Sequence, residues 1–188
     1  MSAATLAAPL AAAFPQEGYH RVPRPMRPGP APRRLEILFL YSRPPLPMTR
    51  GDELTVSHLL EFLHARGHVV DFVTLIGAGQ TMRPEHEAWL RSRCRTVELI
   101  PHSLKRSLPR AARGWLSGWP LQIGLLLSPA QLARVRELVA QHHYDMAYAY
   151  YIRSAEALRE ACRAKPDLPT FMALQLSQTL NTERLART

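Results

Sequence analysis

The residues best placed to do chemistry lie in the loop Ser42–Asp52, which reads SRPPLPMTRGD. Its three prolines hold the backbone extended, and Gly51 permits a close turn before a helix that Thr49 or Asp52 can cap. The N–H groups at a helix N-terminus attract phosphate, and Arg50 can add a bidentate contact to a phosphate or carboxylate. We therefore predict that Arg50, Gly51 and Asp52 bind substrate. The same residues would also suit a strand-to-helix connection that binds no ligand.

This loop matches neither of the two common phosphate-binding patterns. It has a single glycine, so it is not the G-x-G-x-x-G turn of dinucleotide-binding proteins and not a Walker loop. Dinucleotide-binding and P-loop functions are therefore poorly supported.

Histidine spacing gives no sign of a metal site. His142 and His143 are adjacent, so on a helix they point about 100° apart. His58 and His64 are six residues apart, which is not the i+3 or i+4 spacing that places two side chains on one helix face. We predict structural or solvent-facing histidines and no metal ligands.

The elements around the loop predict where it lies. The runs Ile37–Leu40 and Val69–Leu75 are mostly apolar, as in strands covered on both faces, and the residues between them have helical periodicity. The apolar positions of this helix are Val56, Leu59, Leu60 and Leu63. A strand–helix–strand unit of this kind places the loop at the carboxyl edge of a parallel sheet, where open α/β proteins bind their ligands.

Strands and helices alternate along the rest of the chain. We expect helices over 84–93, 129–141 and 154–164, with Ser128 as the N-cap of the second, and strands over 96–100, 145–151 and 169–176. Residues 101–120 are predicted to be irregular, and 180–187 are helix-prone. The predicted fold class is α/β, a doubly wound, mostly parallel Rossmann-like sheet.

Residues 1–34 form a distinct segment. Seven of the 17 prolines fall there among several arginines, and few residues could join a core. This composition predicts a disordered leader, with the folded domain spanning 35–188.

Composition narrows the classes of protein. The chain has 188 residues, of which 46% are hydrophobic and 21% charged, with a formal net charge of +9 that favours anionic partners. No apolar run approaches the roughly 20 residues that span a bilayer, and no Lys or Arg precedes the apolar start as in a secretory signal. Cys94 and Cys162 have no zinc-ligand spacing and predict reduced thiols without a disulfide. We expect a cytoplasmic protein.

The opening of the domain resembles a known family. The run ILFLYSRPPLPMTRGDELTVSHLLEFLHARGHVVDFVTL is similar to the start of family-4-like glycosyltransferases with the B-type, twin-Rossmann fold. In this family the first helix ends in L-x-x-x-G-H-x-V, matched here by Leu63, Gly67, His68 and Val70. The later runs YDMAYAYYIRSAEAL and PTFMALQLSQTLNTERLA follow in the same order as in the family's acceptor-side domain.

The resemblance implies an enzyme of the hexosyltransferase type. Such an enzyme moves a sugar from a nucleotide-activated donor to a glycan or lipid-linked acceptor, with the nucleotide-sugar as co-substrate and no separate cofactor or obligatory metal. The family's second domain binds the nucleotide and carries an E-x7-E motif, and none of that domain is present in these 188 residues. We therefore expect a truncated sheet, a missing donor-binding domain, and a chain that is inactive alone.

The resemblance also carries site residues over by position. Arg153 and Ser154, in the run YIRS after the expected fourth strand, would face the cleft and hold a phosphate or an anionic acceptor group. Where relatives often have an acidic residue, this chain has Gln175, whose amide can bind sugar hydroxyls but cannot act as a base. No catalytic residue is assigned.

The segment 101–120 suggests a further partner. It combines cations with tryptophans, which suits a membrane surface or a lipid-linked acceptor at the inner membrane face. These residues are Lys105, Arg106, Arg110, Arg113, Trp115 and Trp119. An ordinary insert that packs its tryptophans on the core would have the same composition.

Three other functions remain open. The chain would also suit a binding module that pairs with a separate donor-domain subunit, or an unrelated nucleotide-binding α/β protein. A nucleic-acid binder is the least favoured and predicts steeply salt-dependent affinity.

Overall fold

The computed structural model describes residues 33–116, 118 and 121–174. The strands are β1 (Glu36–Tyr41), β2 (Val69–Gly77), β3 (Thr96–His102), β4 (Met146–Tyr150) and β5 (Thr170–Ala173). The helices are α2 (Gly51–Ala65), α3 (Pro84–Arg91), α4 (Leu104–Leu116), α5 (Leu121–Leu126), α6 (Pro129–Gln141), the short 3-10 helix η3 (Ile152–Ser154) and α7 (Ala155–Ala164). The predicted leader, apart from residues 33 and 34, and the helix-prone run 180–187 lie outside the described residues.

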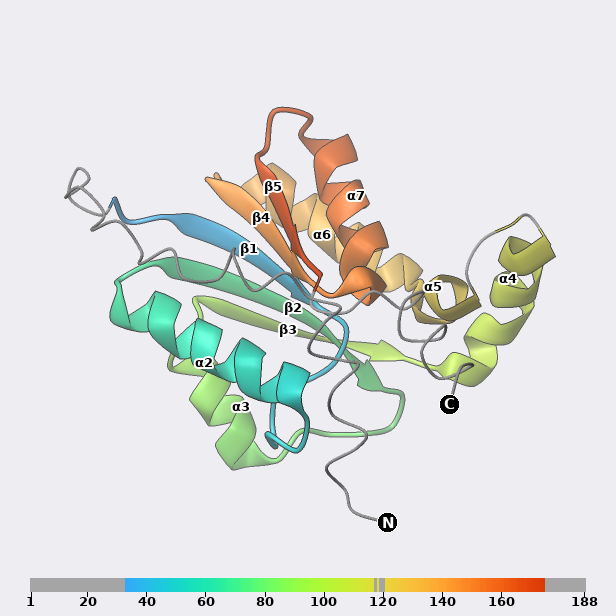
Figure 1. Ribbon diagram of the computed structural model, residues 1–188, viewed down its shortest axis with the longest axis horizontal. Helices are drawn as coiled ribbons and strands as arrows, with labels where there is room; N and C mark the ends of the chain where they lie inside the picture. Colours follow the sequence, from blue (N-terminus) through green and yellow to red (C-terminus); the bar gives the residue numbers. More distant parts are fainter. Residues whose placement is uncertain (1–32, 117, 119–120, 175–188) are drawn as a thin grey trace, which may run out of the picture. The chain divides into compact units, whose positions relative to one another are not determined.

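The predicted fold class is confirmed. The five strands form one parallel sheet in the order β3-β2-β1-β4-β5 (Figure 1), with Leu38 of β1 opposite Asp71 of β2 on one side and Ala147 of β4 on the other. The order reverses between β1 and β4, because β2 and β3 follow on one side of β1 and β4 and β5 on the other. Such a switch point opens a crevice at the carboxyl ends of the two strands.

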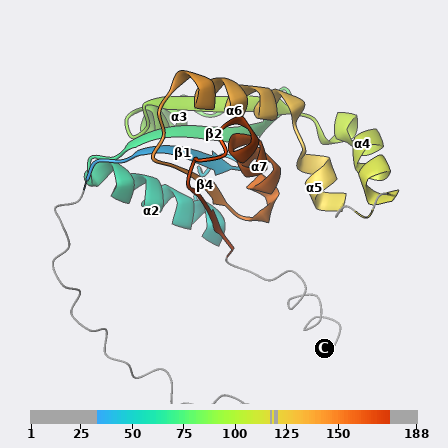
Figure 2. The same ribbon diagram turned by 90° about the horizontal axis from the view of Figure 1, so that it is seen from above.

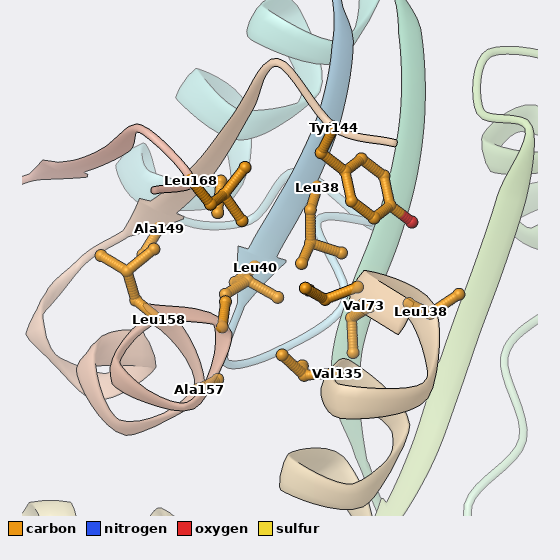
Figure 3. Close-up of a cluster of buried hydrophobic side chains, with 13 residues drawn as sticks. Leu38, Leu40, Val73, Val135, Leu138, Tyr144, Ala149, Ala157, Leu158 and Leu168 are labelled. Carbon is orange, nitrogen blue, oxygen red and sulfur yellow. The ribbon is translucent and has the colours of Figure 1, made fainter. Parts of the chain in front are cut away.

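Helices cover both faces of the sheet. Side chains of α2 and α3, among them Val56, Leu60 and Leu90, pack with Phe39 and Phe72 on one face. On the other face, residues of α6 and α7 pack against the alternate strand positions. Figure 3 shows this second cluster, in which Leu38, Leu40 and Val73 of the sheet meet Val135 and Leu138 of α6 and Leu158 of α7. The apolar strand runs arise because both faces are buried.

The expectation of irregular structure over 101–120 is wrong, because Leu104–Leu116 forms helix α4 around an internal proline, Pro109. Ala111 of α4 is buried, and a Cβ added at Gly124 of α5 would lie only 2.9 Å from the Ala111 Cα atom. The backbones of α4 and α5 therefore approach closely. Tertiary packing of this kind stabilises a helix that local proline and glycine content argues against.

A buried ion-pair network closes the amino edge of the sheet. Asp71 interrupts the apolar run of β2 and is fully buried. Its carboxylate accepts hydrogen bonds from Arg95 (3.0 and 2.6 Å), from the Tyr144 hydroxyl (2.5 Å) and from Thr96 (2.9 Å), and Arg95 also pairs with Glu36 at 2.7 Å. The Asp71 carboxylate thereby joins β2 to the start of β3 and to the segment before β4, and Arg95 extends the network to Glu36, the first residue of β1.

Hydrogen bonding decides the ionisation of Asp71. Desolvation by burial would raise the pKa of this carboxyl, but the bonds from Arg95, Tyr144 and Thr96 together outweigh it, so its pKa lies below the ordinary value. The nearby Cys94 is a free, buried thiol whose pKa burial raises to about 12, and Cys162 is also a free thiol.

Among the described residues, no helix is both long enough and apolar enough to cross a bilayer.

Candidate functional site

The loop predicted to hold the site does lie at the carboxyl edge of the sheet, between β1 and α2. Pro44 and Pro47 of this loop, but not Arg50, Gly51 or Asp52, line a cleft of about 490 Å³ together with Ile76 near the end of β2 and the segment leading into α3. The polar lining residues are Gln80, Thr81, Arg83 and His86, and the apolar ones are Pro44, Leu46, Pro47, Ile76 and Met82. Ligand pockets in proteins have volumes of this order.

Helix α2 begins differently from the expectation that Thr49 or Asp52 caps it. Arg50 is the N-cap residue, and the Glu53 carboxylate reaches back to accept hydrogen bonds from the Arg50 N–H (3.1 Å) and from the Thr49 N–H and hydroxyl (both 2.9 Å). A Glu at the third helical position is the acidic partner of a capping box. Because Glu53 satisfies these donors, Asp52 is released from capping.

Asp52 instead turns toward the end of β1. The Tyr41 hydroxyl donates a 2.7 Å hydrogen bond to Asp52 Oδ2, and Arg43 Nε lies 3.7 Å from the same oxygen. Burial, followed by this hydrogen bond, raises the pKa of Tyr41 far above its ordinary value, so the phenol stays protonated and donates. Asp52 remains partly exposed, with both contacts on Oδ2, which leaves Oδ1 as the oxygen for a ligand.

Tyr150, the last residue of β4, lies beside Tyr41. The two rings meet edge to face with centroids 5.7 Å apart. Tyr150 is only 1% exposed, and its hydroxyl lies within reach of the Thr55 side chain, although the contact does not have full hydrogen-bond geometry. The neighbouring Thr55 hydroxyl donates to the Gly51 carbonyl (2.8 Å), and burial raises the pKa of Tyr150 despite an opposing effect of Thr55.

The chain turns sharply after β4. Tyr151 has φ 73° and ψ 150°, a backbone conformation that residues other than glycine rarely adopt, and η3 follows at once. The Ser154 hydroxyl is buried and donates to the Tyr150 carbonyl at 3.2 Å, so it stabilises this turn from inside the protein. The Arg153 guanidinium lies 5.5 Å from the centre of the Tyr151 ring, and its buried Nε has no partner among the described residues.

Some buried side-chain polar atoms have no hydrogen-bond partner among the described residues. Five such side-chain atoms occur in the described part of the chain, and four belong to residues toward the carboxyl ends of the strands or the first turn of α6. The four are Thr74 Oγ1, Gln131 Nε2, Tyr150 Oη and Arg153 Nε. Thr74 faces the α2 side of the sheet and Gln131 lies on α6 at the opposite face, so these four atoms do not surround one common site.

The predicted site residues separate into three groups. Asp52 is hydrogen-bonded to Tyr41, whose ring contacts Tyr150. The next residue in the chain, Tyr151, has its ring beside the Arg153 guanidinium, so Asp52 and Arg153 are connected through these tyrosines. Arg50 and Gly51 are exposed at the start of α2, and Ser154 is buried in the turn. Gln175 lies outside the described residues.

Sequence reasoning missed the two tyrosines that connect the site. Tyr41 and Tyr150 each end a strand whose inner positions are apolar, so a hydroxyl at each strand end was the available signal. Sequence reasoning also missed Arg43, two residues beyond Tyr41, which contacts the same Asp52 oxygen. In the part of the chain that the structure describes, no group of three or more His, Cys, Asp or Glu side chains is arranged to hold a metal ion.

No protein-family model and no curated protein matches this sequence. Two solved structures of the C-terminal domain of a hydrogenase from Pyrococcus furiosus are similar to it in fold. They give TM-scores of 0.49 and 0.47, each at 12% identity, and cover 77% and 78% of this chain and 96% and 97% of the neighbour. At this identity the likeness concerns the arrangement of strands and helices and not the site.

Proposed function

We propose that this chain is the acceptor-side Rossmann-like domain of a glycosyltransferase that uses a nucleotide-activated sugar. The supporting observation is that Asp52 at the carboxyl edge is held on Oδ2 by Tyr41 and keeps Oδ1 for a ligand, while Tyr150 packs on Tyr41 next to the turn that carries Arg153. Sugars present many hydroxyl groups that both donate and accept hydrogen bonds, and one of them can donate to Oδ1. The resemblance of the strand–loop–helix opening and its G-H-x-V ending supports the same assignment.

In this proposal the residues divide the work of binding. Asp52 accepts a hydrogen bond from a sugar hydroxyl through Oδ1, while Tyr41 fixes the carboxylate from the other side. Arg153 holds a phosphate or another anionic group of the acceptor, because guanidinium pairs well with such groups. Tyr150 packs edge to face on Tyr41 and holds that ring in place. None of these residues is assigned the bond-breaking step.

The nucleotide-binding half of the enzyme belongs to a second domain in this proposal, on the same polypeptide or a separate subunit. We therefore expect the 188-residue chain to bind acceptor sugars without transferring sugar by itself. A pull-down that recovers a second chain with an E-x7-E motif would favour the two-subunit arrangement.

Titration of the chain with mono- and disaccharides and with nucleotide-sugars tests the assignment. Binding is measured by calorimetry and by changes in NMR chemical shift. We expect Asp52→Asn to weaken saccharide binding at least about tenfold, because a charge-assisted hydrogen bond contributes on the order of 1.5–3 kcal/mol. Arg153→Gln should mainly weaken ligands that carry phosphate. Arg91→Gln, at an exposed arginine paired with Glu87 on α3, is the matched control and should change neither.

Two results would overturn the assignment. Tight binding of NAD or NADH at the carboxyl edge would make the chain an unrelated nucleotide-binding protein. Failure of every saccharide and nucleotide-sugar to shift resonances of Tyr41, Tyr150 and Arg153 would remove the sugar site.

A further inference from the structure

Helix α4 presents an apolar stripe that the rest of the domain does not cover. Leu104, Leu108 and Trp115 are 55%, 56% and 65% exposed. Their spacing of four and seven residues places them within roughly 40° of one another around the helix axis. Three large exposed apolar side chains on one face of a single helix form the kind of patch that marks an interaction site.

Packing of α4 on the protein uses other residues. Ser107 and Ala111 are buried, and the close approach of Ala111 to Gly124 joins α4 to α5. Helix α5 is held in turn by a 2.7 Å hydrogen bond between the His102 ring and the Leu125 carbonyl. The exposed stripe is therefore not what attaches α4, and its apolar character requires a different explanation.

The polar side of α4 is basic. Lys105 and Arg113 lie roughly 80° and 160° around the axis from the centre of the stripe, and no Asp or Glu occurs between Leu104 and Leu116. A helix with an apolar stripe on one side and Lys and Arg on the other matches the pattern of helices that lie in the plane of an anionic membrane surface.

We propose that α4 docks this domain on an anionic membrane, with Leu104, Leu108 and Trp115 at the boundary between headgroups and acyl chains and with Lys105 and Arg113 near the lipid phosphates. Leucines favour this partner over nucleic acid, because bases stack on aromatic side chains and gain little from aliphatic ones. The absence of acidic residues from α4 favours it over a second copy of this basic chain, whose net charge is +9.

Docking through α4 would orient the candidate site toward lipid. In both views α4 lies beyond the carboxyl ends of the strands with α5 next to it (Figures 1 and 2), and α5 contacts η3, which holds Arg153. This step rests on the proposed function and deepens it, because it makes the acceptor a phosphate-bearing lipid held in the membrane. Arg153 would then bind the phosphate and Asp52 the attached sugar.

Co-sedimentation of the full 188-residue chain with vesicles tests the docking surface. Vesicles of phosphatidylcholine alone are compared with vesicles in which about 30% of the lipid is phosphatidylglycerol, which gives an anionic surface. We expect strong partitioning to the anionic vesicles that decreases with salt. Leu104→Ser with Leu108→Ser should reduce it tenfold or more, and Lys105→Glu with Arg113→Glu should abolish the preference for anionic lipid.

The matched control replaces two exposed apolar residues of another helix, Leu54→Ser with Phe62→Ser on α2, and should leave partitioning within about twofold. Trp115 supplies a local signal, because its fluorescence should shift to the blue with anionic vesicles and be quenched by brominated lipid, and Trp115→Phe should remove this change. Circular dichroism of each variant checks that the fold is retained.

Absence of partitioning at low salt, or equal partitioning of the α4 and α2 variants, would overturn the proposal. Preferential, α4-dependent binding of RNA or DNA, or α4-dependent dimerisation, would assign the stripe to those partners instead. Because the vesicle assay contains no sugar, failure of the saccharide titrations alongside intact docking would reject the lipid acceptor and leave the membrane surface in place.

Discussion

The hydroxyl of Tyr41 donates to Asp52 Oδ2 at 2.7 Å, and this bond joins the last residue of β1 to the first turn of α2. The proline-rich loop between β1 and α2 therefore begins and ends close together, next to Tyr41. It presents a carboxylate that is held on one oxygen and available on the other. Burial and the bond itself keep the phenol protonated.

Tyr41→Phe should destabilise the protein by about 1.5–3 kcal/mol, since it removes one hydrogen bond to a charged group but keeps the buried ring. Saccharide binding should also weaken, because Asp52 loses the contact that orients it. Urea unfolding measures the first effect and calorimetric titration the second. Tyr148→Phe is the control, because it makes the same chemical change on the same face of the sheet at a hydroxyl that makes no hydrogen bond within the described part of the chain. If the two variants unfold alike, the bond does not contribute to stability.

Asp71→Asn should be the most destabilising of these substitutions, at about 2–4 kcal/mol, because the carboxylate is fully buried and Arg95 loses its main partner. Glu98→Gln is the control, because Glu98 also sits on a strand and pairs at 2.7 Å with an arginine, Arg134, whose exposure is similar to that of Arg95, but the Glu98 carboxylate is partly exposed. A cost below about 1 kcal/mol is expected there. Equal losses of the free energy of unfolding in the two variants would contradict a special role for the buried pair.

Acid stability should depend on the same carboxylate. The pKa of Asp71 is lower in the folded protein than its ordinary value of about 3.9, so the folded state binds fewer protons near that pH. Its contribution is therefore complete above the ordinary value and is lost as the pH falls through the lower, folded value. Urea midpoints between pH 7 and pH 3 should decrease more steeply in the wild-type chain than in Asp71→Asn. Parallel curves would show that other groups dominate acid unfolding.

Tyr151 tests whether the turn after β4 stores strain. Its φ of 73° with ψ of 150° suits glycine and disfavours every residue with a Cβ. Tyr151→Ala and Tyr151→Gly both remove the ring, so their difference isolates the backbone. We expect the glycine variant to be more stable than the alanine variant by about 1–2 kcal/mol in urea unfolding. At Arg66, which ends α2 with φ −84°, the order should reverse or vanish, and the same order at both positions would argue against local strain.

Sequence patterns predict the structure correctly where the interactions that form it are local in sequence. Helix α6 matches its predicted range, because Ser128 caps it and accepts a bond from the Gln131 N–H at 3.3 Å, a relationship local in sequence. The sequence did not predict the hydrogen-bond network of Asp71, the one acidic residue in an apolar strand, because its partners Arg95 and Tyr144 are 24 and 73 residues away. The link from Asp52 through Tyr41 to Tyr150 likewise depends on the pairing of β1 with β4, which no local pattern reveals.

Helix α4 is a case in which the local sequence predicts no helix but a tertiary contact stabilises one. Its proline and its neighbouring glycines predict irregular structure, and only the contact with α5 explains why a helix forms. Gly124 is the residue that permits this contact, because any Cβ there would lie 2.9 Å from the Ala111 Cα atom.

Gly124→Ala should therefore force α4 and α5 apart, and overpacking of this kind costs about 1–3 kcal/mol. Because α4 packs mainly on α5, the loss should be local, with faster hydrogen exchange in α4 and α5 and little change in the sheet. Gly51→Ala is the control, because nothing lies within 4 Å of a Cβ added there. Partitioning to anionic vesicles should weaken in Gly124→Ala and not in Gly51→Ala if a folded α4 is the docking element. Unchanged exchange in α4 would mean that its helix does not depend on α5, and the explanation given above for its formation would be wrong.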